Sequence, residues 1–213
     1  MKFLGRIFLC GLMALALAKA TLAGPSGATT AQLVINGAVC SGTIMAPSTI
    51  LSAAHCFKDD DDDDPVAKFL GHVSPVPTDM TVDGYKVFIE AITYDDADHA
   101  LVKVIFVFKD HAQLAHERPA VGGRVHYWGN AAKLNNVYRE GYVTSYLHSE
   151  MRMDANVFFG DSGAGIFDES GKVVGVVSYL TYSQHAGVGL KFMGAYPLEF
   201  TPLQYSMMGV TPP

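Results

Sequence analysis

Short apolar runs, separated by glycine, proline and Asx residues, dominate the hydrophobic pattern of this chain. The runs are rich in β-branched and aromatic side chains, and no heptad pattern, long helical periodicity or solenoid-type repeat accompanies them. They predict strands at 32–35, 39–45, 85–92, 100–108, 124–128, 137–147, 164–167, 173–180 and 187–195. Several short strands at such spacing are typical of a β-sandwich or a β-barrel, so the pattern predicts an all-β fold.

The stretch 109–123 is polar and contains a proline, and it divides the chain into two halves of similar strand content. A chain of 213 residues is long enough for one large all-β domain or two small ones. With 49% hydrophobic and 17% charged residues, the composition is that of a globular protein with a substantial core. The formal charge of −6 and the lack of a Lys/Arg cluster argue against a nucleic-acid partner.

Residues 1–23 have the layout of a secretory signal peptide, which predicts a secreted or periplasmic protein. A basic start precedes an almost wholly apolar run over 7–18, and small residues follow as far as Ala20 and Ala23. The run is too short for a membrane-spanning helix, which needs roughly 20 apolar residues. We predict cleavage after Ala23, with Ala20 as the alternative. A lipoprotein signal at Cys10 is disfavoured because the apolar run continues past that cysteine.

Removal of this segment changes both the charge and the cysteine count. It takes Lys2, Arg6 and Lys19 from the 15 basic residues, which leaves 12 basic against 21 acidic residues and a net charge of −9. Only Cys40 and Cys56 then remain, and an even pair of cysteines in an exported protein favours a disulfide. Two unpaired buried thiols are the alternative. A zinc site is disfavoured because no further clustered ligands accompany the pair.

Three short motifs carry the chemistry of an activated nucleophile. Ser162 lies in the glycine-flanked turn 160–165, His55 stands directly before a cysteine, and Asp98 opens an apolar run. A serine hydroxyl is a poor nucleophile at neutral pH and needs a base within hydrogen-bond reach. An imidazole, whose unperturbed pKa is about 6.5, can accept and return that proton, and a shielded aspartate can hold it in the required tautomer.

In the order His55, Asp98, Ser162 these motifs resemble those of the chymotrypsin-like (trypsin-fold) serine peptidases. The resemblance covers nearly the whole chain after the predicted signal peptide. In that family a cysteine follows the catalytic histidine directly and pairs with another cysteine a strand earlier. Cys56 and Cys40 match this arrangement, which makes it the most specific signal in the sequence.

The resemblance implies two packed antiparallel six-stranded β-barrels, over about 30–110 and about 122–205, with the active site in the cleft between them. It implies a serine endopeptidase that acts on a protein or peptide substrate through an acyl-enzyme, without a metal or a cofactor. We expect a monomer that makes no membrane contact once the signal is removed. One alternative is a catalytically silent homologue that binds a partner. The intact triad argues against it, because inactive relatives commonly lose a triad member. A second alternative is an esterase with the peptidase fold.

The resemblance also assigns roles to individual residues. Ser162 would attack the substrate carbonyl, His55 would serve as base and then as acid, and Asp98 would orient the imidazole. The backbone N–H groups of Gly160 and Ser162 would stabilise the oxyanion.

Two of these assignments have alternatives. Asp95 and Asp96 lie close to Asp98, but the register against the apolar run favours Asp98, with Asp96 next. The serine motif also fits the nucleophile elbow of α/β-hydrolases, with Asp168 and His185 completing a triad. That interpretation is disfavoured because the pattern contains no crossover helices.

The predicted specificity pocket departs from that of the trypsin-like members. Its floor residue, six before the nucleophile, would be Asn156 rather than an aspartate, so cleavage after Lys or Arg is disfavoured. By resemblance Ser178, Leu180 and Gly187 belong to its walls, and Leu180 in place of a usual glycine would narrow it. We expect small or medium apolar side chains to bind there.

The chain also lacks the terminus that activates the digestive and clotting members, whose freed ammonium pairs with the aspartate before the nucleophile. No Ile/Val-Val-Gly-Gly sequence occurs ahead of Cys40, so Asp161 needs another cation. We predict Arg124 as that partner, with the mature N-terminal amine as the alternative. The enzyme would then be active once it is exported.

Asp59 to Asp64 form a run of consecutive carboxylates just after the histidine loop. We interpret the run as a solvated, self-repelling surface loop. A Ca²⁺ site is the alternative, since Ca²⁺ takes about 6–8 oxygen ligands, although the spacing and the glycine of an EF-hand are missing.

Overall fold

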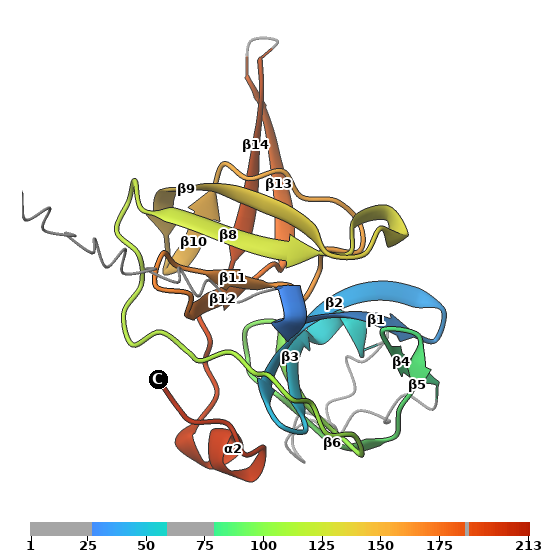
Figure 1. Ribbon diagram of the computed structural model, residues 1–213. Coiled ribbons are helices and arrows are strands. Elements are labelled where there is room, and N and C mark those ends of the chain that lie inside the picture. Colours follow the sequence, from blue (N-terminus) through green and yellow to red (C-terminus); the bar gives the residue numbers. More distant parts are fainter. Residues whose placement is uncertain (1–26, 59–78, 186–187) are drawn as a thin grey trace, which may run out of the picture.

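The computed structural model describes residues 27–58, 79–185 and 188–213, with side chains 182–190 left undescribed. These ranges form two curled antiparallel sheets of seven strands each (Figure 1). This confirms the predicted all-β fold of two barrel-like halves, although each sheet has one strand more than the six expected. The predicted signal peptide and the acidic run 59–64 lie outside the described residues.

The first sheet has the strand order β5-β4-β1-β2-β3-β7-β6. Pairing of β3 with β7, which are distant in the sequence, brings the end of one strand beside the start of the other. The strands are β1 (Thr30–Ile35), β2 (Ala38–Ala46), β3 (Thr49–Ala53), β4 (Met80–Val82), β5 (Tyr85–Lys86), β6 (Ile89–Tyr94) and β7 (His99–Val104).

The second sheet has the order β12-β11-β8-β9-β10-β14-β13, which repeats the topology of the first sheet strand for strand. The two halves of the chain therefore share one architecture. The strands are β8 (Arg124–Gly129), β9 (Val137–Leu147), β10 (Glu150–Met153), β11 (Gly165–Phe167), β12 (Val173–Val176), β13 (Tyr179–His185) and β14 (Val188–Ala195). Within the described residues, three short 3-10 helices accompany the sheets: η1 (Gly27–Thr29), η2 (Ala54–Cys56) and η3 (Ala131–Lys133).

Most of the predicted strands are present with small shifts at their ends, and β9 has the predicted bounds. The predicted strands 85–92 and 173–180 each span parts of two strands. The predicted strands do not include β3, β4 or β10. Of these, β4 and β10 contain three and four residues, which is too few for a hydrophobic pattern to stand out.

Strands β3 and β7 are buried on both faces. Ile50 and Val102 point into the core of the first sheet, whereas Leu51 and Leu101 join a cluster that includes Phe167 of the second sheet. Successive side chains on a strand point to opposite faces, so an unbroken apolar run is required where both faces are buried. The two halves of the chain therefore meet on the outer face of β3 and β7.

The C-terminal segment, residues 196–213, leaves β14 and returns to the first sheet. It contains the helix α2 (Pro202–Met207), which begins with a capping box. The Gln204 side-chain amide donates to the Tyr94 carbonyl at 2.7 Å, which ties the helix to the end of β6. In the described ranges no helix has the length and apolar character needed to cross a membrane.

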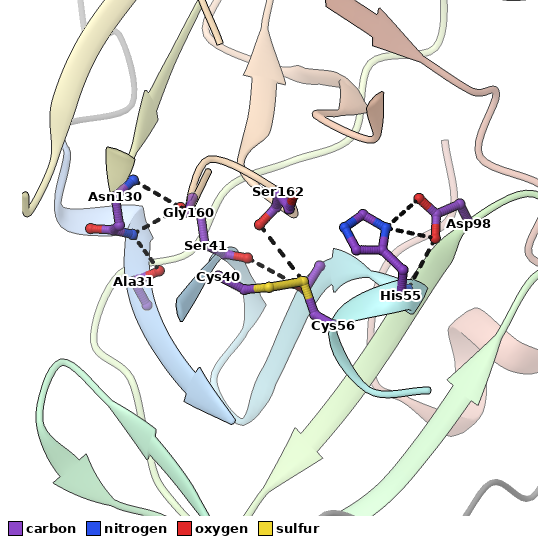
Figure 2. Close-up of a disulfide and its surroundings, with 10 residues drawn as sticks. Ala31, Cys40, Ser41, His55, Cys56, Asp98, Asn130, Gly160 and Ser162 are labelled. Atoms are coloured by element: carbon purple, nitrogen blue, oxygen red, sulfur yellow. Dashed lines mark hydrogen bonds and ion pairs between the residues drawn. A yellow bond between two sulfur atoms is a disulfide. The ribbon is translucent and has the colours of Figure 1, made fainter. Parts of the chain in front are cut away.

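Cys40 and Cys56 form the predicted disulfide, which joins β2 to η2 beside His55 (Figure 2). Free thiols and a zinc site at these two cysteines are thereby excluded. The bond fixes the short helix that carries the histidine against a strand of the first sheet.

Replacing both cysteines by serine should lower the free energy of unfolding by about 3 kcal/mol, because the unfolded chain loses a loop closed across a sequence separation of 16. In a domain of this size the change corresponds to a fall in Tm of roughly 6–12 °C. Thermal unfolding of the wild type and the double variant, with and without a reductant, measures it. A Tm that neither the substitutions nor the reductant lower would contradict the disulfide.

Candidate active site

Two loops at one end of the β3–β7 pair bring His55 and Asp98 together (Figure 2). The antiparallel register sets Ala53 opposite His99, so the residues after β3 lie beside those before β7. The Ala54 N–H donates to the Asp98 carbonyl at 2.9 Å, and the His55 N–H donates to Asp98 Oδ1 at 3.0 Å. The His55 ring nitrogen Nδ1 lies 2.9 Å from Oδ2 and 3.2 Å from Oδ1 of the same carboxylate.

The carboxylate of Asp98 decides which nitrogen of His55 faces the nucleophile. An ionised carboxylate can only accept hydrogen bonds, so Nδ1 carries the shared proton and Nε2 lies on the far side of the ring. Figure 2 draws the ring between Asp98 and Ser162. The His55 side chain is 43% exposed and that of Asp98 18%, so a solute can reach the ring while the carboxylate is shielded.

Of the three aspartates in this loop, Asp98 is the one that contacts the His55 ring. Asp96 is exposed. Asp95 is buried, and its Oδ2 lies 2.6 Å from Nδ1 of His99, a polar residue at the start of the apolar strand β7.

Ser162 lies in a turn that requires glycine on both sides. Gly160 and Gly163 have φ angles of +100° and +87°, in the left-handed region that favours glycine. A Cβ atom on Gly160 would collide with the Asn130 carbonyl oxygen, and one on Gly163 would collide with the Ser41 carbonyl oxygen. The turn can therefore pack this closely against both sheets only with glycine at these positions.

Ser41 of β2 holds the serine turn from the opposite sheet (Figure 2). Its N–H donates to the Ser162 carbonyl and its hydroxyl donates to the Gly160 carbonyl, both at 2.7 Å. The same hydroxyl accepts from the Asn130 N–H at 3.0 Å and from Asn130 Nδ2 at 2.9 Å. Both residues are buried, and neither was predicted from the sequence. The signal in the sequence was a polar residue directly after Cys40, in a strand whose other polar side chain is Thr43.

Within the described part of the chain, the backbone N–H groups of Gly160 and Ser162 donate to no protein acceptor. The N–H between them, that of Asp161, donates instead to the Phe158 carbonyl at 3.0 Å, and the Gly163 N–H is also bonded. In the described ranges the two predicted oxyanion donors are therefore unbonded.

Asp161 places a completely buried carboxylate directly before the serine. Its Oδ2 accepts hydrogen bonds from the Phe158 N–H at 2.9 Å, from the Arg139 guanidinium at 3.0 Å and from the Tyr127 hydroxyl at 3.3 Å. Burial raises the pKa of Asp161, and the Phe158 N–H and the Arg139 charge offset only part of that rise. Arg139 is the cation that neutralises this carboxylate.

The prediction that Arg124 pairs with Asp161 is wrong. Arg124 forms an exposed ion pair with Glu140 on the outer face of β8 and β9. Asp161 packs against Gly129, and positions 124 and 129 of β8 point to opposite faces because their separation is odd. Arg139 reaches the carboxylate from the inner side of the neighbouring strand β9.

An apolar pocket of about 470 Å³ opens beside Ser162. Of the predicted pocket residues, Ser178 and Leu180 line it, whereas Asn156 is exposed and lies outside the lining. Gly187 lies outside the described residues. The complete lining is Val157, Phe158, Phe159, Ser162, Val177, Ser178, Tyr179, Leu180 and Lys191.

Two curled sheets of one topology, with a histidine, an aspartate and a serine carried on loops where they meet, define the architecture of a two-barrel serine protease. Residues 40–176, more than half of the chain, match the trypsin-like peptidase domain. The chain therefore belongs to the trypsin-like peptidase family. The all-β fold also excludes the α/β-hydrolase interpretation of the serine motif.

Solved structures of proteases share this fold. The active form of the Rv3671c protease from M. tuberculosis aligns with a TM-score of 0.67 at 16% identity, over 93% of this chain and 88% of that one. An inactive form of Rv3671c with serine replaced by alanine gives 0.65 at 17% identity, over 93% and 95%. The serine endoprotease from Yersinia pestis gives 0.61 at 18% identity, over 86% and 62%. A search of curated protein sequences finds no match.

Replacing Arg139 by methionine should destabilise the fold by about 3 kcal/mol, because the buried Asp161 carboxylate loses its cation. Arg124→Met is the matched control, since it removes an exposed pair that solvent screens. Urea unfolding of the two variants at neutral pH measures the difference. Equal losses of stability would contradict the assignment of Arg139 to Asp161.

The same variant has a predictable pH dependence. The pKa of Asp161 is raised in the folded protein, so its neutral form favours folding below the unfolded aspartate pKa of about 3.9, and this contribution is lost as pH rises through the raised value. The deficit of Arg139→Met should therefore be smallest at acid pH and grow toward neutrality. Unfolding curves recorded from pH 3 to 7 would show a constant deficit if Asp161 were not the partner.

Proposed function

We propose that this protein is an exported serine endopeptidase that cleaves peptide bonds through Ser162, His55 and Asp98 and an acyl-enzyme intermediate. The observation that carries the proposal is the double contact of Asp98 with His55, through the ring Nδ1 at 2.9 Å and the backbone N–H at 3.0 Å. Membership of the trypsin-like peptidase family supports the reaction class and a protein or peptide substrate.

In this reaction the Ser162 hydroxyl attacks the scissile carbonyl while Nε2 of His55 takes its proton. Asp98 keeps the proton on Nδ1 and stabilises the imidazolium that forms. The imidazolium then protonates the leaving amine, and an acyl ester remains on Ser162. A water molecule, activated by the same imidazole, hydrolyses that ester and restores the hydroxyl.

The Gly160 and Ser162 N–H groups stabilise the negative oxygen of the tetrahedral intermediate. Their lack of protein acceptors in the described ranges supports this role, because a donor already bonded would have to be released first. Such a donor typically contributes about 2.7–4 kcal/mol to the stability of the transition state. The Ser41 contacts to the two neighbouring carbonyls keep the turn in this conformation.

The enzyme does not need a freed N-terminal amine to build this turn. The Arg139 guanidinium already lies 3.0 Å from the Asp161 carboxylate that such an amine would bind. The proposed peptidase is therefore active without cleavage at a zymogen site. Export is supported by the signal-like residues 1–23 and by the Cys40–Cys56 disulfide, which persists in oxidising compartments.

The pocket beside Ser162 favours an apolar substrate side chain. Val157, Phe158 and Val177 contribute apolar lining, and among the described residues no carboxylate lines the pocket to offset a bound Lys or Arg. Leu180 lies at the pocket and is 45% exposed, so it limits the size of the side chain that enters.

Ser162→Ala should abolish covalent labelling by a serine-directed phosphonate and lower peptide hydrolysis on the order of 10⁴-fold or more, because the nucleophile is removed. Asp98→Asn should lower kcat by roughly 10⁴-fold, since the amide favours the wrong imidazole tautomer. Mass spectrometry of the labelled protein and steady-state kinetics measure the two effects. The proposed catalytic role of Ser162 would be contradicted if Ser162→Ala were still labelled, or if the wild type reacted with neither the phosphonate nor a peptide. The catalytically silent homologue would then be the remaining interpretation.

Consider peptide substrates that differ only in the residue directly before the scissile bond. Those with a small or medium apolar residue at that position should be cleaved faster than those with Lys or Arg. Leu180→Gly should shift this preference toward larger aromatic side chains, because it removes the side chain that narrows the pocket. Values of kcat/KM for a matched peptide series measure both effects. A preference for Lys or Arg would contradict the assignment of this pocket.

A further inference from the structure

Asp95 has a completely buried carboxylate that lies outside the proposed triad and accepts five hydrogen bonds. Its Oδ1 accepts from the backbone N–H groups of Ala97, Asp98 and His99, at 3.1, 3.2 and 2.9 Å. Its Oδ2 accepts from Nδ1 of His99 at 2.6 Å and from the Glu199 N–H at 2.9 Å. These five bonds replace the water that an ionised carboxylate loses on burial.

The hydrogen bonds of Asp95 set the backbone on which Asp98 is carried. The Asp98 N–H donates to Asp95, and the Asp98 carbonyl accepts from the Ala54 N–H at 2.9 Å. Both backbone polar groups of Asp98 are therefore bonded. The direction in which its side chain meets His55 follows from the geometry of the turn that Asp95 closes.

His99 completes the surroundings of Asp95. Burial alone would raise the pKa of Asp95, but the hydrogen bond and charge of His99 and the Glu199 N–H lower it, so the carboxylate is ionised at neutral pH. The His99 ring therefore donates its Nδ1 proton to Oδ2. The ring is completely buried, with its centroid 6.3 Å from that of Phe200, and its Nε2 has no hydrogen-bond partner in the described ranges.

The fifth hydrogen bond comes from the opposite end of the chain. Glu199 belongs to the C-terminal segment, which α2 ties to the first sheet. The Gln204 side-chain amide donates to the Tyr94 carbonyl at 2.7 Å and to the Thr93 hydroxyl at 2.8 Å. Tyr94 directly precedes Asp95. The C-terminal segment is therefore bonded both to the residues just before the turn, through Gln204, and to Asp95 itself, through the Glu199 N–H.

We propose that Asp95, His99 and the Glu199 N–H form a positioning unit for Asp98. The C-terminal segment is then required for turnover through the backbone N–H of Glu199, which donates to Asp95 and to no atom of the triad. This inference rests on the proposed function, because it acts through the contact between Asp98 and His55. Asp95 and His99 are positioning residues and touch no reacting atom.

Asp95→Asn tests the unit with a side chain of the same size. The remaining oxygen can still accept hydrogen bonds from the turn, but the NH2 group that replaces Oδ2 cannot accept from the His99 ring or the Glu199 N–H. We expect kcat to fall roughly 10- to 100-fold with little change in KM, because a displacement of about 1 Å in an orienting group costs up to about 10²-fold. The acid limb of the kcat/KM profile should move to lower pH, since a displaced Asp98 stabilises the imidazolium less.

A matched pair of variants isolates the C-terminal contact. Glu199→Pro removes the backbone N–H that donates a hydrogen bond to Asp95, whereas Glu199→Ala keeps it. Only the proline variant should lower kcat and move the acid limb. Thr49→Val controls for general weakening of the segment, since it removes the 2.5 Å hydrogen bond from Thr49 to the Met208 carbonyl and leaves the 95–99 turn intact. It should lower the Tm alone.

The outcomes separate the two proposals. Lower kcat together with a shifted acid limb in Asp95→Asn and Glu199→Pro, and in neither control, supports the positioning unit. The positioning unit is overturned if Asp95→Asn and Glu199→Pro keep the wild-type kcat and pH profile. It is also overturned if they lose kcat only in proportion to their loss of Tm, on the scale that Thr49→Val sets. Either result leaves the proposed peptidase function intact. A wild type without Ser162-dependent turnover overturns the proposed function and the unit with it.

Discussion

The buried hydroxyl of Ser41 donates to the Gly160 carbonyl and accepts from the backbone and side-chain amides of Asn130, while the Ser41 N–H donates to the Ser162 carbonyl. Apolar packing between the two sheets is non-directional and tolerates a small slide. These four hydrogen bonds are directional, and they allow one position of the serine turn against β2. Losing the hydroxyl would leave buried polar groups unpaired, at about 1–3 kcal/mol for each. The same hydrogen bonds therefore fix both the position of one sheet against the other and the conformation of the serine turn.

Behind each of the two loops that face His55 lies a buried carboxylate. Asp161 and Arg139 lie behind the serine turn, and Asp95 and His99 lie behind the aspartate loop. A buried charge is tolerated only when hydrogen-bond donors replace its water, and those donors must be held in place. Each carboxylate therefore organises the backbone around it. The rigidity of the candidate site comes from groups that do not take part in its proposed chemistry.

The sequence alone was enough to predict the all-β class, the division into two halves, the disulfide and the bounds of β9, because each leaves a local signal in composition or spacing. The partner of Asp161 was not predictable in this way, since it depends on which face of β8 points inward and on what the neighbouring strand places there. Arg124 and Arg139 look alike in the sequence, and only the pairing of strands separates them. The role of His99 was equally hidden, because a buried histidine in an apolar strand leaves no trace of the carboxylate it binds.

The contacts that shape the site join distant parts of the chain. Ser41 and Gly160 are 119 residues apart, and Asp95 and Glu199 are 104 residues apart. Closing such long loops costs chain entropy before any contact offsets it, whereas the hairpins within each sheet close locally. On this topology we expect the local hairpins to form first, and the site to form only when both sheets have docked and the last residues have returned to the first sheet. If the protein is the proposed peptidase, a chain that is still folding would have no assembled site with which to cut its unfolded neighbours.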